Sequence, residues 1–218
     1  MLTEAGNYRY DHSEFRAWSI SSAVHNTVLV DGGGQDRRSR YKWRDENLRD
    51  RADVTYVSTD KISHASGIYQ CWYEGGIFAR HERRVYLMHV CDLLLVVDRL
   101  CAPGSHNFTV LWHIDSELES SAENALSFRD QRLLCQQDVD VRVVKGHAGY
   151  PIQGFVASAD RNHALPIPCV EVAARGSEVR LVTAITGNRN FESLIADSDV
   201  QSTRICIITK DGQRLSFD

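Results

Sequence analysis

Short runs of alternating or β-branched apolar residues recur along the whole chain, and turn residues separate them. The strongest are Ile77 to Val90 and Leu93 to Val97. No segment of eleven or more residues keeps the i, i+3, i+4, i+7 apolar spacing that an amphipathic helix needs. We therefore predict an all-β protein, a large antiparallel β-sandwich with no substantial helix.

The pattern also predicts where the strands lie. Ile77 to Val90 and Leu93 to Val97 form a central hairpin that turns near Cys91-Asp92, and Pro103-Gly104 is expected to end its second strand. No linker or internal repeat divides the chain, so we expect one domain over residues 1–218. Further strands are expected at Tyr8–Tyr10, Thr27–Asp31, Val54–Ser58, Gly67–Tyr73, Asn107–Ile114, Ala125–Phe128, Arg132–Cys135, Val139–Val144, Gln153–Ala157, Cys169–Ala174, Val179–Thr186, Gln201–Thr209 and Gln213–Phe217.

Charge and hydropathy exclude several classes of partner. A net charge of -4 and a pI near 6.1 argue against nucleic acid or an anionic membrane held by bulk electrostatics. The longest apolar run, around Val90 to Val97, is interrupted by Asp92 and is too short to span a bilayer. The start of the chain lacks the pattern of a signal peptide, so we expect an intracellular protein or a piece of a longer one. The six cysteines show no metal-ligand spacing and are expected to be reduced core residues.

The stretch from His25 to Gln35 is the most unusual in the sequence. It combines a His-Asn entry, the β-branched run Thr27 to Val30, and Asp31 before three glycines. An ordinary hairpin does not need this combination of residues, so we expect a rigid strand that presents polar groups. No G-x-S-x-G, P-loop or G-x-G-x-x-G motif accompanies it.

Three polar residues, His25, Asp53 and His81, interrupt strands or strand ends where apolar residues are expected. Two imidazoles and a carboxylate form a ligand set that zinc accepts. The same residues could equally be hydrogen-bonded strand residues. Tyr69 has two similar interpretations, as a general acid or base whose pKa is lowered by positive neighbours or as a packing residue.

The stretch from Gln35 to Arg51 is the most charged part of the chain. It is either a solvated loop or a segment whose arginines line a groove for an anionic ligand, since guanidinium groups match carboxylates and sulfates. The residues alone leave both interpretations open.

A series of motifs carries a resemblance to a known family. The order runs from Gly6-x-Tyr8-x-Tyr10 through His25-Asn26-Thr27-Val28 and Tyr69 to His81-x-Arg83 and Val96-Val97-Asp98-Arg99. It resembles the C-terminal β-sheet domain of the heparinase II/III family of polysaccharide lyases, which includes oligoalginate lyases. The match is specific from Gly6 to Arg99, and beyond Leu100 it depends on the strand pattern.

The resemblance implies a supersandwich-like fold from a bacterial enzyme that cleaves acidic polysaccharides or oligosaccharides at a uronic acid by β-elimination. In the family, the sugar chain binds between this sandwich and an N-terminal (α/α) toroid. Few residues precede the match, so we expect a fragment or a truncated gene product that is inactive without the toroid. A non-catalytic carbohydrate-binding or assembly module is the alternative, and a purely structural sandwich is a third. Localisation stays unknown, since family members are often periplasmic or secreted.

The resemblance also assigns roles to residues. His25 and His81 match metal-binding histidines, and Asp53 is the best candidate for the carboxylate ligand of a structural zinc ion. Asp45 and Asp50 compete with it for that role. Tyr69 falls where the family's sandwich tyrosine contributes to proton transfer, and Arg83 and Asn26 are expected to contact substrate. One departure is Ala23, where several members carry a further catalytic histidine.

Overall fold

The computed structural model describes residues 2–36, 53–187, 189–197 and 204–217. Its regular structure is mainly β, as predicted, with a short helix α1 (Glu14–Ser19) and a 3-10 turn η1 (Ser22–Val24) near the N-terminus. The strands in chain order are β1 (Val28–Val30), β2 (Asp53–Ser58), β3 (Ile62–Tyr73), β4 (Ile77–Met88), β5 (Leu93–His113), β6 (Leu118–Ala122), β7 (Ala125–Phe128), β8 (Arg132–Cys135), β9 (Asp140–Lys145), β10 (Phe155–Ala157), β11 (Ala164–Pro166), β12 (Pro168–Thr186), β13 (Phe191–Ala196), β14 (Ile205–Thr209) and β15 (Arg214–Phe217).

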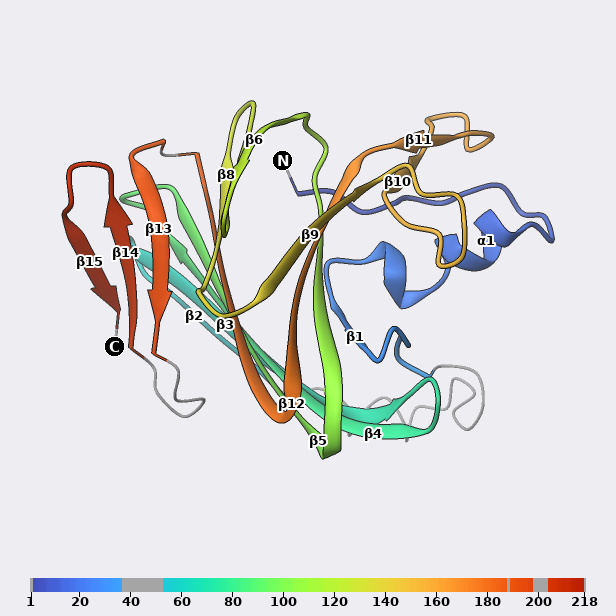
Figure 1. The fold of residues 1–218 in the computed structure, drawn as a ribbon, viewed down its shortest axis with the longest axis horizontal. Helices are drawn as coiled ribbons and strands as arrows, with labels where there is room; N and C mark the ends of the chain where they lie inside the picture. Colours follow the sequence, from blue (N-terminus) through green and yellow to red (C-terminus); the bar gives the residue numbers. More distant parts are fainter. Residues whose placement is uncertain (1, 37–52, 188, 198–203, 218) are drawn as a thin grey trace.

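Two long antiparallel strands, β5 and β12, organise the fold, and both bend near their middle (Figure 1). On one side of the bend they pair with β4 and β8, and on the other side with β1 and β9. One large sheet therefore supplies both layers of the sandwich. It runs in the order β2-β3-β4-β5-β12-β8-β7-β6, with β1 and β9 added at the far halves of β5 and β12.

The prediction that Pro103-Gly104 ends a strand is wrong, because β5 continues through it. The register of β5 against β12 shifts between Gly176 and Glu178, which pair with His106 and Cys101. Pro103 therefore falls in the unpaired part of the ladder, where a missing N–H costs no strand bond. Gly104 takes a positive φ of 90° at the same bend. The expected strands on either side of the bend in β5, and likewise in β12, are halves of one strand.

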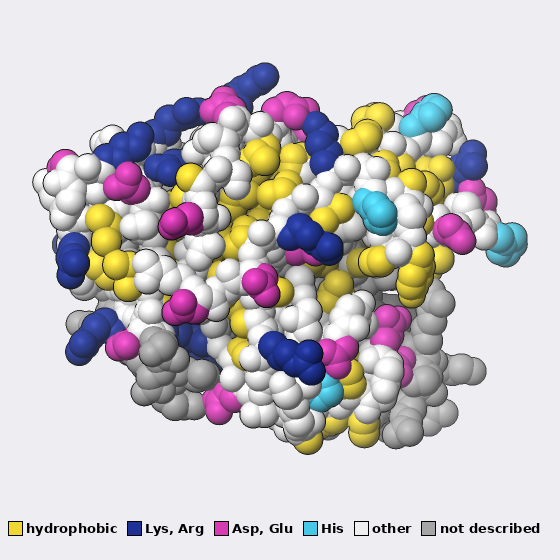
Figure 2. Space-filling model, in the orientation of Figure 1, with side chains coloured by type: hydrophobic (Ala, Val, Ile, Leu, Met, Phe, Trp, Pro, Cys, Tyr) yellow, Lys and Arg dark blue, Asp and Glu magenta, His cyan; other side chains and the backbone are white. Residues whose placement is uncertain are grey.

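The main core lies between the two halves of the bent sheet. Val28 and Val110 from one half and Leu100 and Leu181 from the other are almost fully buried in it. Apolar side chains are visible between β6–β8 and β9, where the halves separate (Figure 2). A second core packs the opposite face of β5 and β12 against β13 and β14, and a third packs α1 against Phe155.

The structure also tests the remaining predictions about strands, cysteines and membrane-spanning helices. The expected strand at Tyr8–Tyr10 is wrong, because this segment bonds to a loop through Arg9 N and Arg161 O at 2.9 Å. Strands β6, β11 and β13 were not predicted, since they are short or lack a clear alternation. All six cysteines are free, and three of them (Cys71, Cys135 and Cys169) are buried as expected of core residues, whereas Cys91, Cys101 and Cys206 are only partly buried. None of the helices among the described residues has the length and apolar content to cross a membrane.

Candidate functional site

Polar residues gather on the face of β3, β4 and β5 that is turned toward the main core. Tyr69 on β3 is the direct register partner of His81 on β4, and Arg83 on β4 is the partner of Asp98 on β5. Directly opposed strand residues place their Cβ atoms about 5 Å apart. The sheet therefore brings together three residues that the sequence singled out, Tyr69, His81 and Arg83.

Asp98 holds this cluster together. Its carboxylate accepts from His81 Nε2 at 2.6 Å and from Arg83 Nε and Nη2 at 2.7 and 3.0 Å. The side chain of Asp98 is only 1% exposed. Burial alone would raise the pKa of Asp98, but the Arg83 charge and the His81 hydrogen bond outweigh burial and hold that pKa at about 2. Asp98 is therefore an ionised, buried anchor for two functional candidates.

Arg83 links β4 to the segment between His25 and β1. Its Nη1 donates to the backbone oxygen of Asn26, while its other nitrogens remain on Asp98. The guanidinium also lies over the Trp112 ring, 5.1 Å from the ring centroid. Arg83 thus connects β4, β5 and the His25-Asn26 segment, and its predicted contact with substrate stays a prediction.

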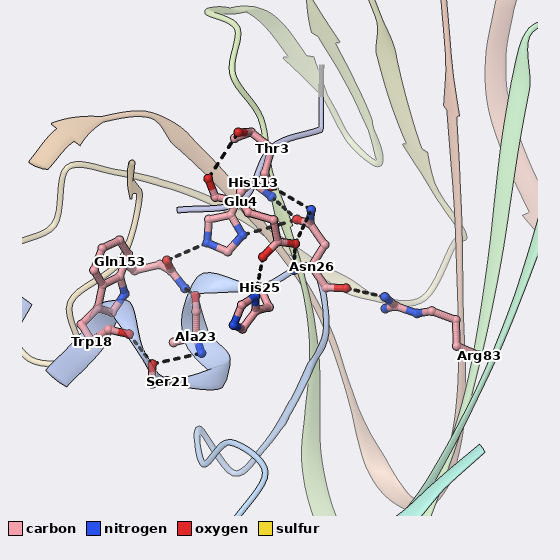
Figure 3. A network of polar contacts seen from close by, with 10 residues as sticks. All are labelled: Thr3, Glu4, Trp18, Ser21, Ala23, His25, Asn26, Arg83, His113 and Gln153. Atoms are coloured by element: carbon pink, nitrogen blue, oxygen red, sulfur yellow. Dashed lines mark hydrogen bonds and ion pairs between the residues drawn. The ribbon is translucent and has the colours of Figure 1, made fainter. Parts of the chain in front are cut away.

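The amide of Asn26 is the centre of the network drawn in Figure 3. Its Nδ2 donates to Thr3 O at 2.8 Å, and its Oδ1 accepts from the backbone N–H of His113 at 2.7 Å. The N-terminal segment, β5 and the segment that precedes β1 therefore meet at one side chain. Its role in substrate binding also stays a prediction.

Behind Asn26, the buried ring of His113 continues the network. His113 Nε2 donates to Gln153 Oε1 at 3.2 Å, and Gln153 Nε2 donates to Ala23 O at 3.1 Å. Burial lowers the pKa of His113, and the hydrogen bond to Gln153 opposes this shift. A neutral imidazole therefore supports the segment just before His25.

His25 itself lies at the surface. Its Nδ1 contacts the Glu4 carboxylate, and the two side chains are 51% and 52% exposed. From His25 a chain of contacts runs through the Asn26 backbone, Arg83 and Asp98 to His81. The two predicted metal-binding histidines thus belong to one connected part of the molecule.

The predicted carboxylate ligand is not aligned with these histidines. Asp53 begins β2, and its register partner is Ile68, whose own partner on β4 is Glu82 and not His81. The side chain of Asp53 lies outside what the structure describes, as do Asp45, Asp50 and most of the charged stretch from Gln35 to Arg51. Among the described residues, no three His, Cys, Asp or Glu side chains form a group that could hold a metal ion.

Each of the two histidines nevertheless suits a metal in one respect. One ring nitrogen of His25 and one of His81 contact a carboxylate, as the non-coordinating nitrogen of a metal-bound histidine often does. His25 Nε2 and His81 Nδ1 are the nitrogens that such a site would use. The zinc site of His25, His81 and Asp53 stays a prediction.

Tyr69 lies beside a second, deeper tyrosine. Its ring packs edge-on against Tyr73 with centroids 5.8 Å apart, and its hydroxyl contacts Trp72 O at 3.5 Å. Tyr73 is fully buried, and burial raises the pKa of its hydroxyl. Tyr73 therefore fixes one edge of the Tyr69 ring and stays protonated itself.

Sequence reasoning assigned no role to Glu4, Asp98, His113 or Gln153. Only Asp98 carried a usable signal, since it is the one carboxylate inside the apolar run that begins at Leu93. The other three are brought to the site by segments far apart in the chain.

Comparison with solved structures shows that this fold also occurs in heparan sulfate lyases. The heparan sulfate lyase HepC from Pedobacter heparinus matches with a TM-score of 0.72, 14% identity, and coverage of 99% of this chain and 34% of that one. A heparinase III gene product gives the same four values. This chain therefore spans about a third of the length of these structures.

The family model described as "Heparinase II/III-like, C-terminal" matches residues 1–180. The chain belongs to this family, which confirms the resemblance seen in the motifs. No curated protein matches the chain.

Proposed function

We propose that this chain is the β-sandwich portion of a lyase that cleaves uronic-acid-containing polysaccharides or oligosaccharides by β-elimination together with an (α/α) toroid domain. The observation that carries the proposal is the register pairing of Tyr69 with His81 beside the buried Asp98–Arg83 pair. Family membership and the fold shared with heparan sulfate lyases support it.

β-Elimination requires removal of the proton at C5 of the uronic acid and protonation of the leaving glycosidic oxygen. In this proposal Tyr69 takes part in one of these proton transfers, a task worth about 10²- to 10⁴-fold in rate. Negative charge develops on the substrate carboxylate as the C5 proton leaves, so fixed donors near it stabilise the transition state more than the ground state. Asn26 and Arg83 keep their proposed place beside the substrate.

A zinc ion belongs to the proposal as a structural group. His25, His81 and a carboxylate, with Asp53 as the candidate, would hold it. When bound, it would supply positive charge and a fixed link between the His25 segment and β4.

The product of elimination gives a direct test, because an unsaturated uronate absorbs in the ultraviolet. The chain is incubated with alginate, heparan sulfate and related polymers, both alone and covalently joined to a toroid domain from the family. An absorbance rise in the joined protein is the expected result. Binding without any absorbance rise would favour the carbohydrate-binding module instead. If the protein shows no binding and no absorbance rise, both the lyase and the binding-module proposals are overturned.

A further inference from the structure

Asp98 makes two different kinds of contact from one buried carboxylate. One contact is with a single ring nitrogen, His81 Nε2, at 2.6 Å. The other is with two guanidinium nitrogens of Arg83, Nε and Nη2. A buried carboxylate whose two oxygens both accept from the guanidinium of Arg83 is the ionised partner of an ion pair and can only accept hydrogen bonds. The proton in the contact with His81 must therefore reside on His81 Nε2.

We infer that Asp98 is a positioning residue whose carboxylate sets the tautomer of His81, so that Nδ1 is the basic nitrogen that His81 offers at the site. In a neutral imidazole only one ring nitrogen carries a proton. Because Asp98 keeps that proton on Nε2, the lone pair is on Nδ1, where it can accept a proton or bind a metal ion. The consequence for catalysis rests on the proposed lyase function, whereas the tautomer does not.

Arg83 makes this arrangement rigid. Its Nε and Nη2 hold both oxygens of Asp98, so the carboxylate cannot rotate away from His81 without breaking a bidentate ion pair. Arg83 is itself fixed by the Asn26 backbone oxygen and by the Trp112 ring. The orientation of His81 is thus tied to the His25-Asn26 segment through Asp98.

Glu82, the neighbour of His81 on β4, provides an internal comparison. Its carboxylate is 11% exposed and accepts from Arg80 Nη2 at 2.8 Å and from Arg84 Nε at 2.7 Å. Successive strand residues point to opposite faces, so Glu82 lies on the other side of the sheet from His81. Replacing Glu82 removes a carboxylate from two arginines of the same strand without touching the ring of His81.

The test is nuclear magnetic resonance of the full chain with ¹⁵N-labelled histidine, at a pH at which the His81 ring is neutral. The chain has nine histidines, and the His81 signals are identified by their loss in His81→Gln. We expect wild type and Glu82→Gln to show one His81 tautomer, with the proton on Nε2. Asp98→Asn should shift His81 to a mixture or to the Nδ1–H form, since an amide presents a donor as well as an acceptor.

A wild-type His81 with its proton on Nδ1 overturns the inference, as does an unchanged tautomer in a folded Asp98→Asn protein. If Asp98→Asn does not fold, the wild-type spectrum alone decides, because it already distinguishes the two tautomers.

A second measurement addresses catalysis in the toroid-joined protein. Asp98→Asn is expected to lower kcat about 10- to 100-fold with little change in KM, as losses of a histidine's supporting partner do, and Glu82→Gln is expected to leave kcat unchanged. An unchanged kcat with an altered tautomer overturns the positioning role. Absence of activity in the wild type counts against the proposed lyase function and leaves the tautomer result standing.

Discussion

Tyr69 and His81 lie directly opposite each other on β3 and β4, on the same face of the sheet as the buried Asp98. This pairing places a phenol beside an imidazole whose ring is held by a carboxylate at 2.6 Å. A sheet fixes such a neighbourhood more firmly than a loop does, because ladder hydrogen bonds on both sides of β4 hold the strand.

Removing the Tyr69 hydroxyl tests its role in proton transfer. In the toroid-joined protein, Tyr69→Phe is expected to lower kcat by about 10²- to 10⁴-fold, because general acid or base catalysis is lost while the ring still packs on Tyr73. The matched control is Tyr150→Phe, since Tyr150 is fully exposed at 101%. A Tyr69→Phe rate equal to wild type would remove Tyr69 from the mechanism.

The Asn26 amide should contribute measurably to stability. Asn26→Ala leaves Thr3 O and the His113 N–H without their partner, and the expected loss in free energy of unfolding is roughly 1–3 kcal/mol. Urea denaturation measures it. Asn107→Ala is the control, because the one hydrogen bond of the Asn107 side chain to a described residue is an exposed contact of 3.4 Å to Thr109. Equal stability losses in the two variants would contradict the stabilising role of the hydrogen bonds that Asn26 makes to Thr3 and His113.

The pair His106 and Asp31 predicts a pH dependence of stability. His106 Nδ1 lies 2.7 Å from Asp31 Oδ2, and this contact raises the pKa of His106 and lowers the pKa of Asp31. The histidine contribution is complete below its ordinary pKa of 6.5 and is lost as pH rises through the raised value. The aspartate contribution is complete above its ordinary pKa of 3.8 and is lost as pH falls through the lowered value. The pair therefore stabilises the fold most between these two ordinary values.

His106→Gln should consequently cost more stability at about pH 5.5 than at about pH 8.5. The difference should be at most about 1 kcal/mol, because the pair is partly exposed to solvent. Denaturant unfolding at the two pH values measures it. His163→Gln serves as the control, since His163 lies 3.6 Å from Asp160 and is 72% exposed. A cost for His106→Gln that does not change with pH would contradict the assignment.

Metal content tests the zinc prediction directly. Elemental analysis of protein purified without added metal should find zinc, and a chelator should lower the thermal midpoint. His25→Ala should lose the metal, whereas His163→Ala, which removes an imidazole that is 72% exposed, should keep it. Protein without zinc whose thermal midpoint is unchanged by His25→Ala would rule the site out.

The alternation of apolar residues determined the fold class, since period-2 patterns place one face of each strand in a core. Short-range signals also located most strands, including β7 and β8 with the expected bounds. The motifs that contain His25, His81 and Asp98 were enough to indicate the family, because each keeps a distinctive residue order within a few positions.

Tertiary structure alone decided how the site is assembled. The bend in β5 could not be predicted from the sequence, because Pro103-Gly104 is typical of a strand end. Only the structure shows that these residues lie in a gap of the β5–β12 ladder. Asp98 became an anchor only when register placed it opposite Arg83 and within reach of His81. Sequence patterns describe the period along one strand, whereas the contacts of a site depend on the register between strands, which long-range packing sets.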